Sequence, residues 1–452
     1  MVTVTLVYPY FQPSNDNSIF RFPPLGLGYI AAYLKKHDIS VQLIDCTFMS
    51  QEEALEKIRL SEPKIIGMQV VYSIREKAIR IAELLKKECE LLVAGGPLPT
   101  SNPEHFLPHF DVVAIGEGEQ TMFELVNAMQ NGGSLMDVKG IVFKEKGRII
   151  VTPARDFIKD LDNVPFPSRE LFDNRAYENY YQRNFGYTTT SVMTSRGCPF
   201  QCHFCSRPVF GNRFRSRTAP NIAEEVEAVR RLGYERVWFA DDCFTLDRKR
   251  LLEICNELIH RHVNIGWECL SRVDTVDLEV AAKMKQAGCL RVFFGLESGN
   301  DSILKIMKKQ ATIKQAKDAV YAFRKVGIQV GAFFILGYPG ENGKTMLDTV
   351  KFASSLPLDY LSFTFPYPIP GTELFDKVKQ RMISEEWQEP ENLHLIKHKL
   401  LFDSPFSETK LKFAVFKGMT QFYMRKYLRT RLYSLVGKPY ESLTDIIYQI
   451  LN

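Results

Sequence analysis

Residues 196–205 read RGCPFQCHFC and follow a β-branched run at 188–194 that we expect to form a strand. The motif places Cys198, Cys202 and Cys205 on one short loop. Each thiolate can bind one iron of a cubane cluster, because iron–sulfur clusters are normally held by cysteine thiolates. No fourth cysteine stands nearby, so one iron would stay open to a small chelating ligand. Gly197 permits the tight backbone that would wrap such a cluster.

A zinc site is the alternative interpretation of these cysteines. Zinc ribbons usually have two CxxC pairs, or one pair with distant histidines. Here His203 lies between the cysteines and no second pair exists, so the iron–sulfur interpretation is favoured. The chain has nine cysteines, and the six outside the motif are scattered along the sequence. An odd number without regular spacing argues against a disulfide framework. We therefore expect a cytosolic protein.

Residues 188–374 alternate strand and helix patterns. The expected strands lie at 188–194, 236–240, 264–269, 291–296, 329–336 and 360–364. Six strands with crossover helices predict a parallel sheet, either open or closed into a partial (β/α)6, TIM-like barrel, and we take the partial barrel as the expected fold. Ligand-binding side chains should lie where these strands end, because the strand-to-helix loops gather at that edge.

Polar side chains follow three of these strands. Asp241 and Asp242 follow the second strand, Arg272 the third, and Glu297 with Ser298 the fourth. Carboxylates there can accept charge-assisted hydrogen bonds from an ammonium group or a ribose diol. The Asp–Asp pair could instead only cap the next helix. Basic residues at 207 and 213–217 could face an anionic ligand or lie on a solvated loop.

The CxxxCxxC loop resembles that of the radical S-adenosylmethionine superfamily, as do WFADD (238–242), FGLESG (294–299) and GYPGE (337–341). The resemblance implies a 4Fe–4S cluster whose open iron chelates S-adenosylmethionine, and reductive cleavage of that cofactor to a 5′-deoxyadenosyl radical. It implies that Asp241 or Asp242 meets the methionine amino group, and that Glu297 and Ser298 lie near the ribose. Arg272 is then a candidate for the methionine carboxylate. An external electron donor such as flavodoxin or ferredoxin is also implied.

Residues 1–150 predict a doubly wound, Rossmann-like domain. Short apolar strands at 2–8, 40–44, 65–71, 91–94 and 112–115 alternate with helical stretches, and a hairpin follows at 140–151. Such a sheet binds ligands at its switch point, beyond the strands' carboxyl ends. The residues that we expect to contact a cofactor there are Ser73, Gly95, Gly96, Gly116, Glu117 and Gly118.

This part of the chain resembles the cobalamin-binding domain fused to many radical S-adenosylmethionine enzymes. The most specific stretches are PPLGLGYIAAYL (23–34) and IGEGEQTMFELV (115–126). The DxHxxG motif that supplies a lower cobalt ligand in many cobalamin proteins is absent, and Leu98 stands where many fused domains have histidine. The resemblance therefore implies cobalamin without a lower histidine from the protein, or else a cofactor-free domain that shapes the substrate site.

Residues 151–187 are expected to be a linker and 375–452 a helical C-terminal region. The stretch 408–436 mixes aromatic with basic residues at helical spacing. A helix that caps the active-site opening is favoured, and contact with an anionic membrane is the alternative. The net charge of +5 over 452 residues does not indicate a nucleic-acid partner. We see neither a signal peptide nor an apolar run long enough to span a membrane.

Four functions fit these motifs. The first is cobalamin-dependent methylation of an unactivated carbon in a small-molecule, lipid or tetrapyrrole-like substrate. The second is a radical cyclase or oxidative enzyme resembling the anaerobic cyclases of chlorophyll synthesis. A methylthiotransferase is disfavoured, because Cys46 and Cys89 are the only cysteines before the motif. A cofactor sensor without enzymatic activity is the fourth.

Overall fold

The computed structural model describes residues 4–13, 17–384, 400–428 and 432–451. The chain divides into two compact units with interleaved boundaries. The first comprises Met1–Pro199, Arg207–Arg217 and Arg231–Glu235, and the second comprises Phe200–Ser206, Thr218–Arg230 and Arg236–Asn452. The predicted four-part division at residues 150, 187 and 374 stays a prediction.

A seven-stranded sheet forms the centre of the first unit, in the order β2-β1-β3-β4-β5-β6-β7. Strands β1 to β5 are parallel, whereas β6 and β7 form the predicted antiparallel hairpin. The bounds are β1 Val4–Tyr8, β2 Val41–Asp45, β3 Ile65–Gln69, β4 Leu91–Gly95, β5 Val112–Ala114, β6 Ile141–Glu145 and β7 Arg148–Val151.

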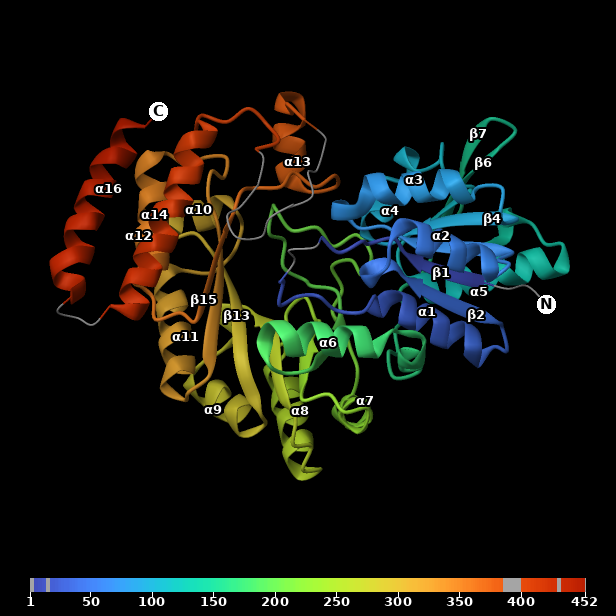
Figure 1. Cartoon of the computed structure of the whole chain (residues 1–452), viewed down its shortest axis with the longest axis horizontal. Helices are drawn as coiled ribbons and strands as arrows, with labels where there is room; N and C mark the ends of the chain where they lie inside the picture. Colours follow the sequence, from blue (N-terminus) through green and yellow to red (C-terminus); the bar gives the residue numbers. More distant parts are fainter. Residues whose placement is uncertain (1–3, 14–16, 385–399, 429–431, 452) are drawn as a thin grey trace. The chain divides into compact units, whose positions relative to one another are not determined.

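Helices cover both faces of this sheet, as the continuous apolar strands predicted. Alternate strand residues point to opposite faces, so Ile65 packs into one core and Ile66 into the other. Helices α1 (Leu25–Lys36) and α5 (Gly118–Asn131) cover one face, and α2 (Gln51–Leu60) and α3 (Arg75–Leu85) the other (Figure 1). The doubly wound prediction is confirmed.

The first unit also contains elements outside this sheet. The predicted linker includes a helix, α6 (Asn174–Phe185), whose Tyr177 and Tyr181 are buried. The short helix α4 (Pro97–Ser101) follows β4. Strands β8 (Thr189–Val192), β9 (Ser195–Arg196) and β10 (Arg215–Ser216) lie close to the cysteine motif in sequence.

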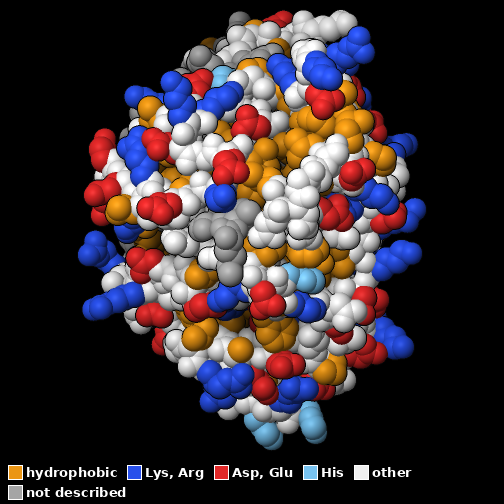
Figure 2. All heavy atoms as spheres, turned by 90° about the vertical axis from the view of Figure 1, so that its right-hand side faces the viewer, with side chains coloured by type: hydrophobic (Ala, Val, Ile, Leu, Met, Phe, Trp, Pro, Cys, Tyr) orange, Lys and Arg blue, Asp and Glu red, His pale blue; other side chains and the backbone are white. Residues whose placement is uncertain are grey.

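Figure 2 shows one face of the molecule, on which basic and acidic side chains are intermixed rather than gathered by sign.

Five parallel strands in the order β15-β14-β13-β12-β11 form the sheet of the second unit. Their bounds are β11 Arg236–Phe239, β12 Gly266–Ser271, β13 Cys289–Glu297, β14 Gln329–Ile335 and β15 Tyr360–Thr364. Together with β8 they stand where the six strands were predicted. The connecting helices are α7 Ala219–Arg231, α8 Arg248–His260, α9 Leu278–Gln286, α10 Asp301–Ile306, α11 Ile313–Lys325 and α12 Gly343–Ser355.

The C-terminal helices of the second unit are α13 (Glu373–Val378), α14 (Glu408–Tyr427) and α16 (Lys438–Ile450). Helix α14 packs against both α12 and α16 (Figure 1). The helical prediction for the C-terminal region is confirmed there, whereas its parts at 385–399 and 429–431 lie outside the described residues. No helix in the described ranges is long and apolar enough to cross a membrane.

Candidate functional site

The second unit brings the predicted polar side chains to one edge of its sheet. Asp241 lies two residues beyond β11, Arg272 directly follows β12, and Glu297 is the last residue of β13. Strands β11, β12 and β13 are parallel neighbours, so their carboxyl ends meet at the same edge. The juxtaposition inferred from strand order is therefore present in the structure.

Glu297 is buried and has a left-handed backbone with φ of 66°, which is uncommon for a residue with a side chain. Its Oε1 lies 3.0 Å from Nζ of the buried Lys309. A Cβ at Gly295 would lie 2.3 Å from the same Oε1 and 3.0 Å from the Lys309 Nζ. The first glycine of FGLESG is therefore needed so that the carboxylate can fold back toward the lysine.

Lys309 is a site residue that sequence reasoning missed. Burial disfavours its ammonium charge, but the charges of Glu297 and Cys202 more than offset this and raise the pKa of Lys309. In the sequence it is one of two adjacent lysines, and its neighbour Lys308 is only half-buried. Nothing in the linear sequence distinguishes the two, because only packing decides which lysine is buried.

Arg272 joins the end of β12 to the cysteine loop. Its Nε and Nη2 donate to the two carboxylate oxygens of Asp274 at 2.9 and 2.8 Å. Its Nη2 also donates to the backbone oxygen of Lys309 at 2.5 Å, and its Nη1 lies 3.7 Å from Sγ of Cys202. The guanidinium lies 3.5 Å from the ring centroid of Phe200. These contacts make Arg272 a brace for the loop, and its binding of a methionine carboxylate stays a prediction.

The adjacent acids after β11 have different environments. Asp241 is buried, with Oδ2 3.7 Å from Nη2 of Arg250, whereas Asp242 is exposed. Neither caps the next helix, because the N-cap of α8 is Asp247, which accepts from the backbone N–H of Arg250. The helix-cap alternative is therefore wrong.

Ser298 holds the end of β13 to α12. Its hydroxyl oxygen lies 3.0 Å from that of Thr349, which also accepts from the backbone N–H of Gly299 at 3.0 Å. A Cβ at Gly299 would come within 2.7 Å of Cα of Thr349, so glycine allows this close approach. Contact of Ser298 with a ribose stays a prediction.

In the cysteine motif, Cys198 and Cys202 are buried, whereas Cys205 is exposed. The backbone of His203 fixes the loop: its N–H donates to Met307 at 3.0 Å, and its oxygen accepts from Leu374 at 2.9 Å. The His203 imidazole is 2.9 Å from a carboxylate oxygen of Glu373 in α13. Within the described ranges no three His, Cys, Asp or Glu side chains are grouped to hold a metal ion, so cluster ligation by the three cysteines stays a prediction.

Two buried polar atoms after β14 have no hydrogen-bond partner among the residues that the structure describes. They are the hydroxyl of Tyr338 and Oε1 of Glu341. The other oxygen of Glu341 accepts from the backbone N–H groups of Gly337 and Tyr338 at 2.7 and 3.0 Å. Burial raises the pKa of Glu341 to about 7. The Tyr338 ring is 6.4 Å from that of Phe204 in the cysteine motif. Unsatisfied buried polar atoms are uncommon, so these two fit a site for a polar cofactor.

In the first unit the strand order reverses between β1 and β3, which defines the switch point. Oε1 of Gln69, at the end of β3, is buried and has no hydrogen-bond partner in the described part of the chain. Gly96, after β4, has φ of 104°, and a Cβ there would lie 3.0 Å from the backbone oxygen of Val70. Ser73 is exposed just beyond β3. An unsatisfied amide oxygen and a required glycine at this edge fit a bound polar cofactor.

The acidic side chains of the turn after β5 form ion pairs within the protein. Glu117 is buried, and its carboxylate pairs with Arg196 at 2.7 Å and Arg215 at 2.9 Å. Glu119 pairs with Arg196 at 2.5 Å. These pairs fix strands β9 and β10, so Arg215 is neither on a solvated loop nor open to an anionic ligand. Contact of Glu117 with a cofactor stays a prediction.

The glycines around this turn serve the backbone. Gly116 has φ of 81°, and its N–H donates to the hydroxyl of Thr100 at 3.1 Å. A Cβ at Gly118 would come within 2.7 Å of Ile30, so this glycine lets α5 approach α1. Gly95 ends β4, where a Cβ would meet only Ala114 at 3.9 Å. Leu98 is buried in the core and offers no metal ligand. The nature of any lower cobalt ligand stays a prediction.

Comparison with known proteins agrees with this architecture. Residues 192–353 match the radical SAM superfamily, and residues 16–126 match the B12 binding domain. The chain is 35% identical over 380 residues to an uncharacterized methyltransferase of Pyrococcus horikoshii, a match that covers 80% of this chain and 81% of that protein. It is 28% identical over 394 residues to the anaerobic magnesium-protoporphyrin IX monomethyl ester cyclase of Rubrivivax gelatinosus, with coverages of 84% and 70%.

A similar fold occurs in TsrM from Kitasatospora setae, a radical S-adenosylmethionine methyltransferase solved with cobalamin and a 4Fe–4S cluster bound. The TM-score is 0.71 at 18% identity, with coverages of 88% of this chain and 80% of that one. This likeness shows that the two chains share a fold over most of their length.

Proposed function

Because the chain belongs to the radical SAM superfamily and carries a B12 binding domain, we propose that it is a cobalamin-dependent methyltransferase that acts on an unactivated carbon. The observation that carries the methyl-transfer part is the 35% identity to a methyltransferase over 80% of the chain. The substrate class is a small molecule, or a lipid or tetrapyrrole-like compound. An external flavodoxin or ferredoxin would supply electrons.

The residues that would hold the cofactors follow from the site. Cys198, Cys202 and Cys205 would ligate the cluster, and the carboxyl edge of the first sheet, near Gln69 and Gly96, would receive cobalamin. When bound, the reduced cluster and S-adenosylmethionine supply radical chemistry, and cobalamin supplies a methyl carrier.

Glu297 presents a carboxylate acceptor suited to ribose hydroxyls, and Lys309 holds it in orientation at 3.0 Å. Arg272 braces the cysteine loop through its contacts with Asp274 and Phe200. The unsatisfied Tyr338 hydroxyl can donate to a polar group of S-adenosylmethionine. Most of these groups are buried, which strengthens each hydrogen bond that they make with the cofactor.

The test uses anaerobically reconstituted protein, hydroxocobalamin, a chemical reductant and S-adenosylmethionine labelled in its methyl group. A methyltransferase should move the label to the protein-bound cobalamin before any substrate is known. Absence of label on cobalamin, with normal cleavage to 5′-deoxyadenosine, would refute methyl transfer and favour a radical cyclase. The 28% identity to a cyclase over 84% of the chain makes that the second candidate. No cleavage at all would favour a cofactor sensor.

The acids after β11 provide a matched pair of variants. Asp241 is buried at the sheet edge, so Asp241→Ala should weaken S-adenosylmethionine binding by roughly ten- to a hundredfold, the cost of one charge-assisted hydrogen bond. Asp242→Ala is the control, because its side chain is exposed. Both variants should keep the wild-type iron content. Equal cofactor affinity in the two variants would contradict the assignment of Asp241.

A further inference from the structure

The last helical segment of the chain exposes a continuous apolar stripe. The segment begins at Leu432 and covers the π-helical turn Tyr433–Gly437 and helix α16, Lys438–Ile450. Its exposed large apolar residues stand three, four or seven positions apart, and these separations place them on one side of a helix. We call the following residues the outer stripe: Leu432, Leu435, Val436, Leu443, Ile446, Ile447 and Ile450, with exposed fractions between 37% and 73%.

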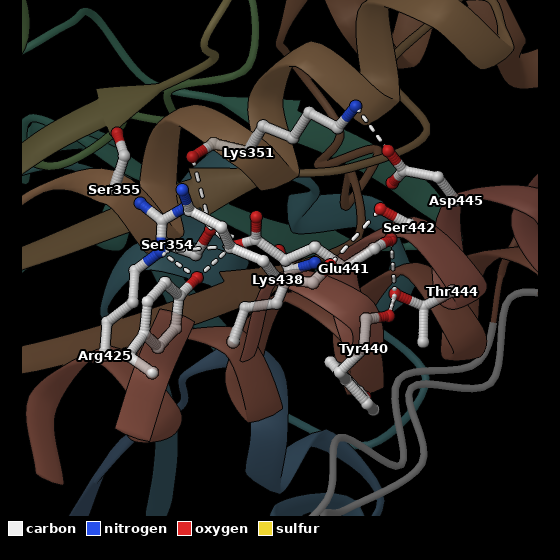
Figure 3. A network of polar contacts seen from close by, with 12 residues as sticks. Lys351, Ser354, Ser355, Arg425, Lys438, Tyr440, Glu441, Ser442, Thr444 and Asp445 are labelled. Carbon is white, nitrogen blue, oxygen red and sulfur yellow. Dashed lines mark hydrogen bonds and ion pairs between the residues drawn. The ribbon is translucent and has the colours of Figure 1, made fainter. Parts of the chain in front are cut away.

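The opposite side of this segment is polar and faces the protein. Asp445 lies 2.7 Å from Nζ of the fully buried Lys417 in α14 and 2.6 Å from Nζ of Lys351 in α12. Glu441 pairs with Arg425 of α14 at 2.6 Å. Figure 3 shows Lys351 of α12 directed toward Asp445 of α16, and Arg425 of α14 beside Glu441. Tyr448 is buried on this side as well, and its hydroxyl donates to the backbone oxygen of Gly343 at 3.0 Å, so ion pairs and one aromatic side chain attach the segment while its aliphatic residues stay outside.

This arrangement is the reverse of an ordinary surface helix, which buries its apolar side and exposes its charges. Seven large aliphatic side chains in one stripe exceed the scattered single apolar residues that are normal on a protein surface. An exposed apolar patch of this kind marks a surface that binds another protein or a membrane. The ion pairs of Asp445 and Glu441 fix the helix so that this side stays outward.

The charges near the stripe indicate which surface covers it. The stripe itself contains no charged residue. Within the described part of 408–451, the acidic residues Glu408, Glu441 and Asp445 each pair with a Lys or Arg. The charged side chains outside these pairs are Lys410, Lys426 and Lys438, all of them basic. Anionic lipid headgroups complement them, because basic residues beside an apolar helix face add electrostatic attraction to insertion. Self-association through a two-fold axis would bring the same surface against itself and offer these lysines no acidic partner from that surface.

We propose that the outer stripe lies in the interface of an anionic membrane, with Lys410, Lys426 and Lys438 attracted to its headgroups. The segment that faces lipid differs from the one expected from the sequence. The membrane alternative was assigned to 408–436, but α14 buries Leu411, Val415 and Phe422 within the protein. The surface for lipid is the later segment, 432–450.

The experiment is flotation of the full chain with vesicles of phosphatidylcholine alone and of phosphatidylcholine mixed with phosphatidylglycerol. The wild type should bind the anionic vesicles, bind less as ionic strength rises, and bind neutral vesicles weakly. The triple variant Leu443→Ser, Ile446→Ser, Ile450→Ser should bind at least about tenfold more weakly, because three aliphatic side chains no longer enter the lipid. Leu60→Ser, at another apolar residue with 75% exposure, is the matched control and should bind like the wild type.

Three results would overturn the proposal. The first is that the wild type fails to bind anionic vesicles. The second is equal binding to neutral and anionic vesicles, which removes the role of the three lysines. The third is a wild-type oligomer in sedimentation that the triple variant disperses, with vesicle binding unchanged, which assigns the stripe to a second copy. Thermal unfolding of the triple variant at the wild-type midpoint shows that lost vesicle binding is not lost folding.

Discussion

Removal of Lys309 tests the buried pair at the edge of the second sheet. The side chains of Lys309 and Glu297 are 8% and 9% exposed, and Nζ and Oε1 are 3.0 Å apart. Lys309→Met keeps most of the aliphatic stem but leaves the carboxylate buried without its partner. Breaking a buried pair in this way costs about 3–5 kcal/mol of the free energy of unfolding.

The assay is urea unfolding of the cofactor-free protein, followed by tryptophan fluorescence. Trp238 lies in β11 and Trp267 in β12, so the signal reports on the sheet that carries the pair. The double variant Glu297→Gln, Lys309→Met removes both charges and should be more stable than Lys309→Met alone, because no uncompensated charge remains.

The control is Lys314→Met on the surface of α11. Lys314 and Asp318 are also 3.0 Å apart, but their side chains are 88% and 64% exposed. Loss of such a pair should change the free energy of unfolding by less than about 0.5 kcal/mol. The reasoning is refuted if Lys309→Met costs less than about 1 kcal/mol, or if the double variant is no more stable than that single variant.

Three further predictions concern the cofactors and pH. Replacing Cys198, Cys202 and Cys205 with Ala should abolish iron binding and the ~400 nm absorption of an iron–sulfur protein, and a cluster retained in this triple variant would exclude the proposed ligands. Added hydroxocobalamin should bind at about one per chain without the absorption signature of a lower nitrogen ligand, and failure to bind in any redox state would remove the methyltransferase proposal. Burial raises the pKa of Glu341 to about 7 in the folded protein. Protonated Glu341 therefore stabilises the folded state fully below the ordinary carboxyl pKa, and this contribution to the free energy of unfolding is lost as pH rises through about 7. Glu341→Gln should therefore gain stability relative to the wild type on raising the pH from about 5 to 7, with a limiting slope of about 1.4 kcal/mol per pH unit, and parallel pH profiles in denaturant titrations would contradict the assignment.

Local patterns were sufficient for the fold and for much of the site. Continuous apolar runs such as Ile65–Gln69 predicted a sheet covered on both faces, because a strand with two buried faces has no polar alternation. The places of Asp241, Arg272 and Glu297 followed from strand order alone, since parallel strands end at one edge. The glycine of FGLESG could be recognised in the sequence, but the reason for it is the 2.3 Å approach of Glu297 to its Cβ position.

Only the tertiary structure decided which charged residues face inward. Cofactor contact by Glu117 stays a prediction, and the sequence did not indicate that its carboxylate pairs with Arg196 and Arg215, which are about 80 and 100 residues away in sequence. Lys308 and Lys309 are adjacent in the sequence, as are Asp241 and Asp242. Only the packing of the folded chain decides that Lys309 and Asp241 are the buried members of these pairs. The sequence of 438–450 has an apolar and a polar side, whichever of the two faces the protein. The pairing of Asp445 with Lys417 and Lys351 turns the polar side inward and the apolar side outward. Sequence periodicity defines the faces of a helix, whereas long-range contacts determine which face the protein buries.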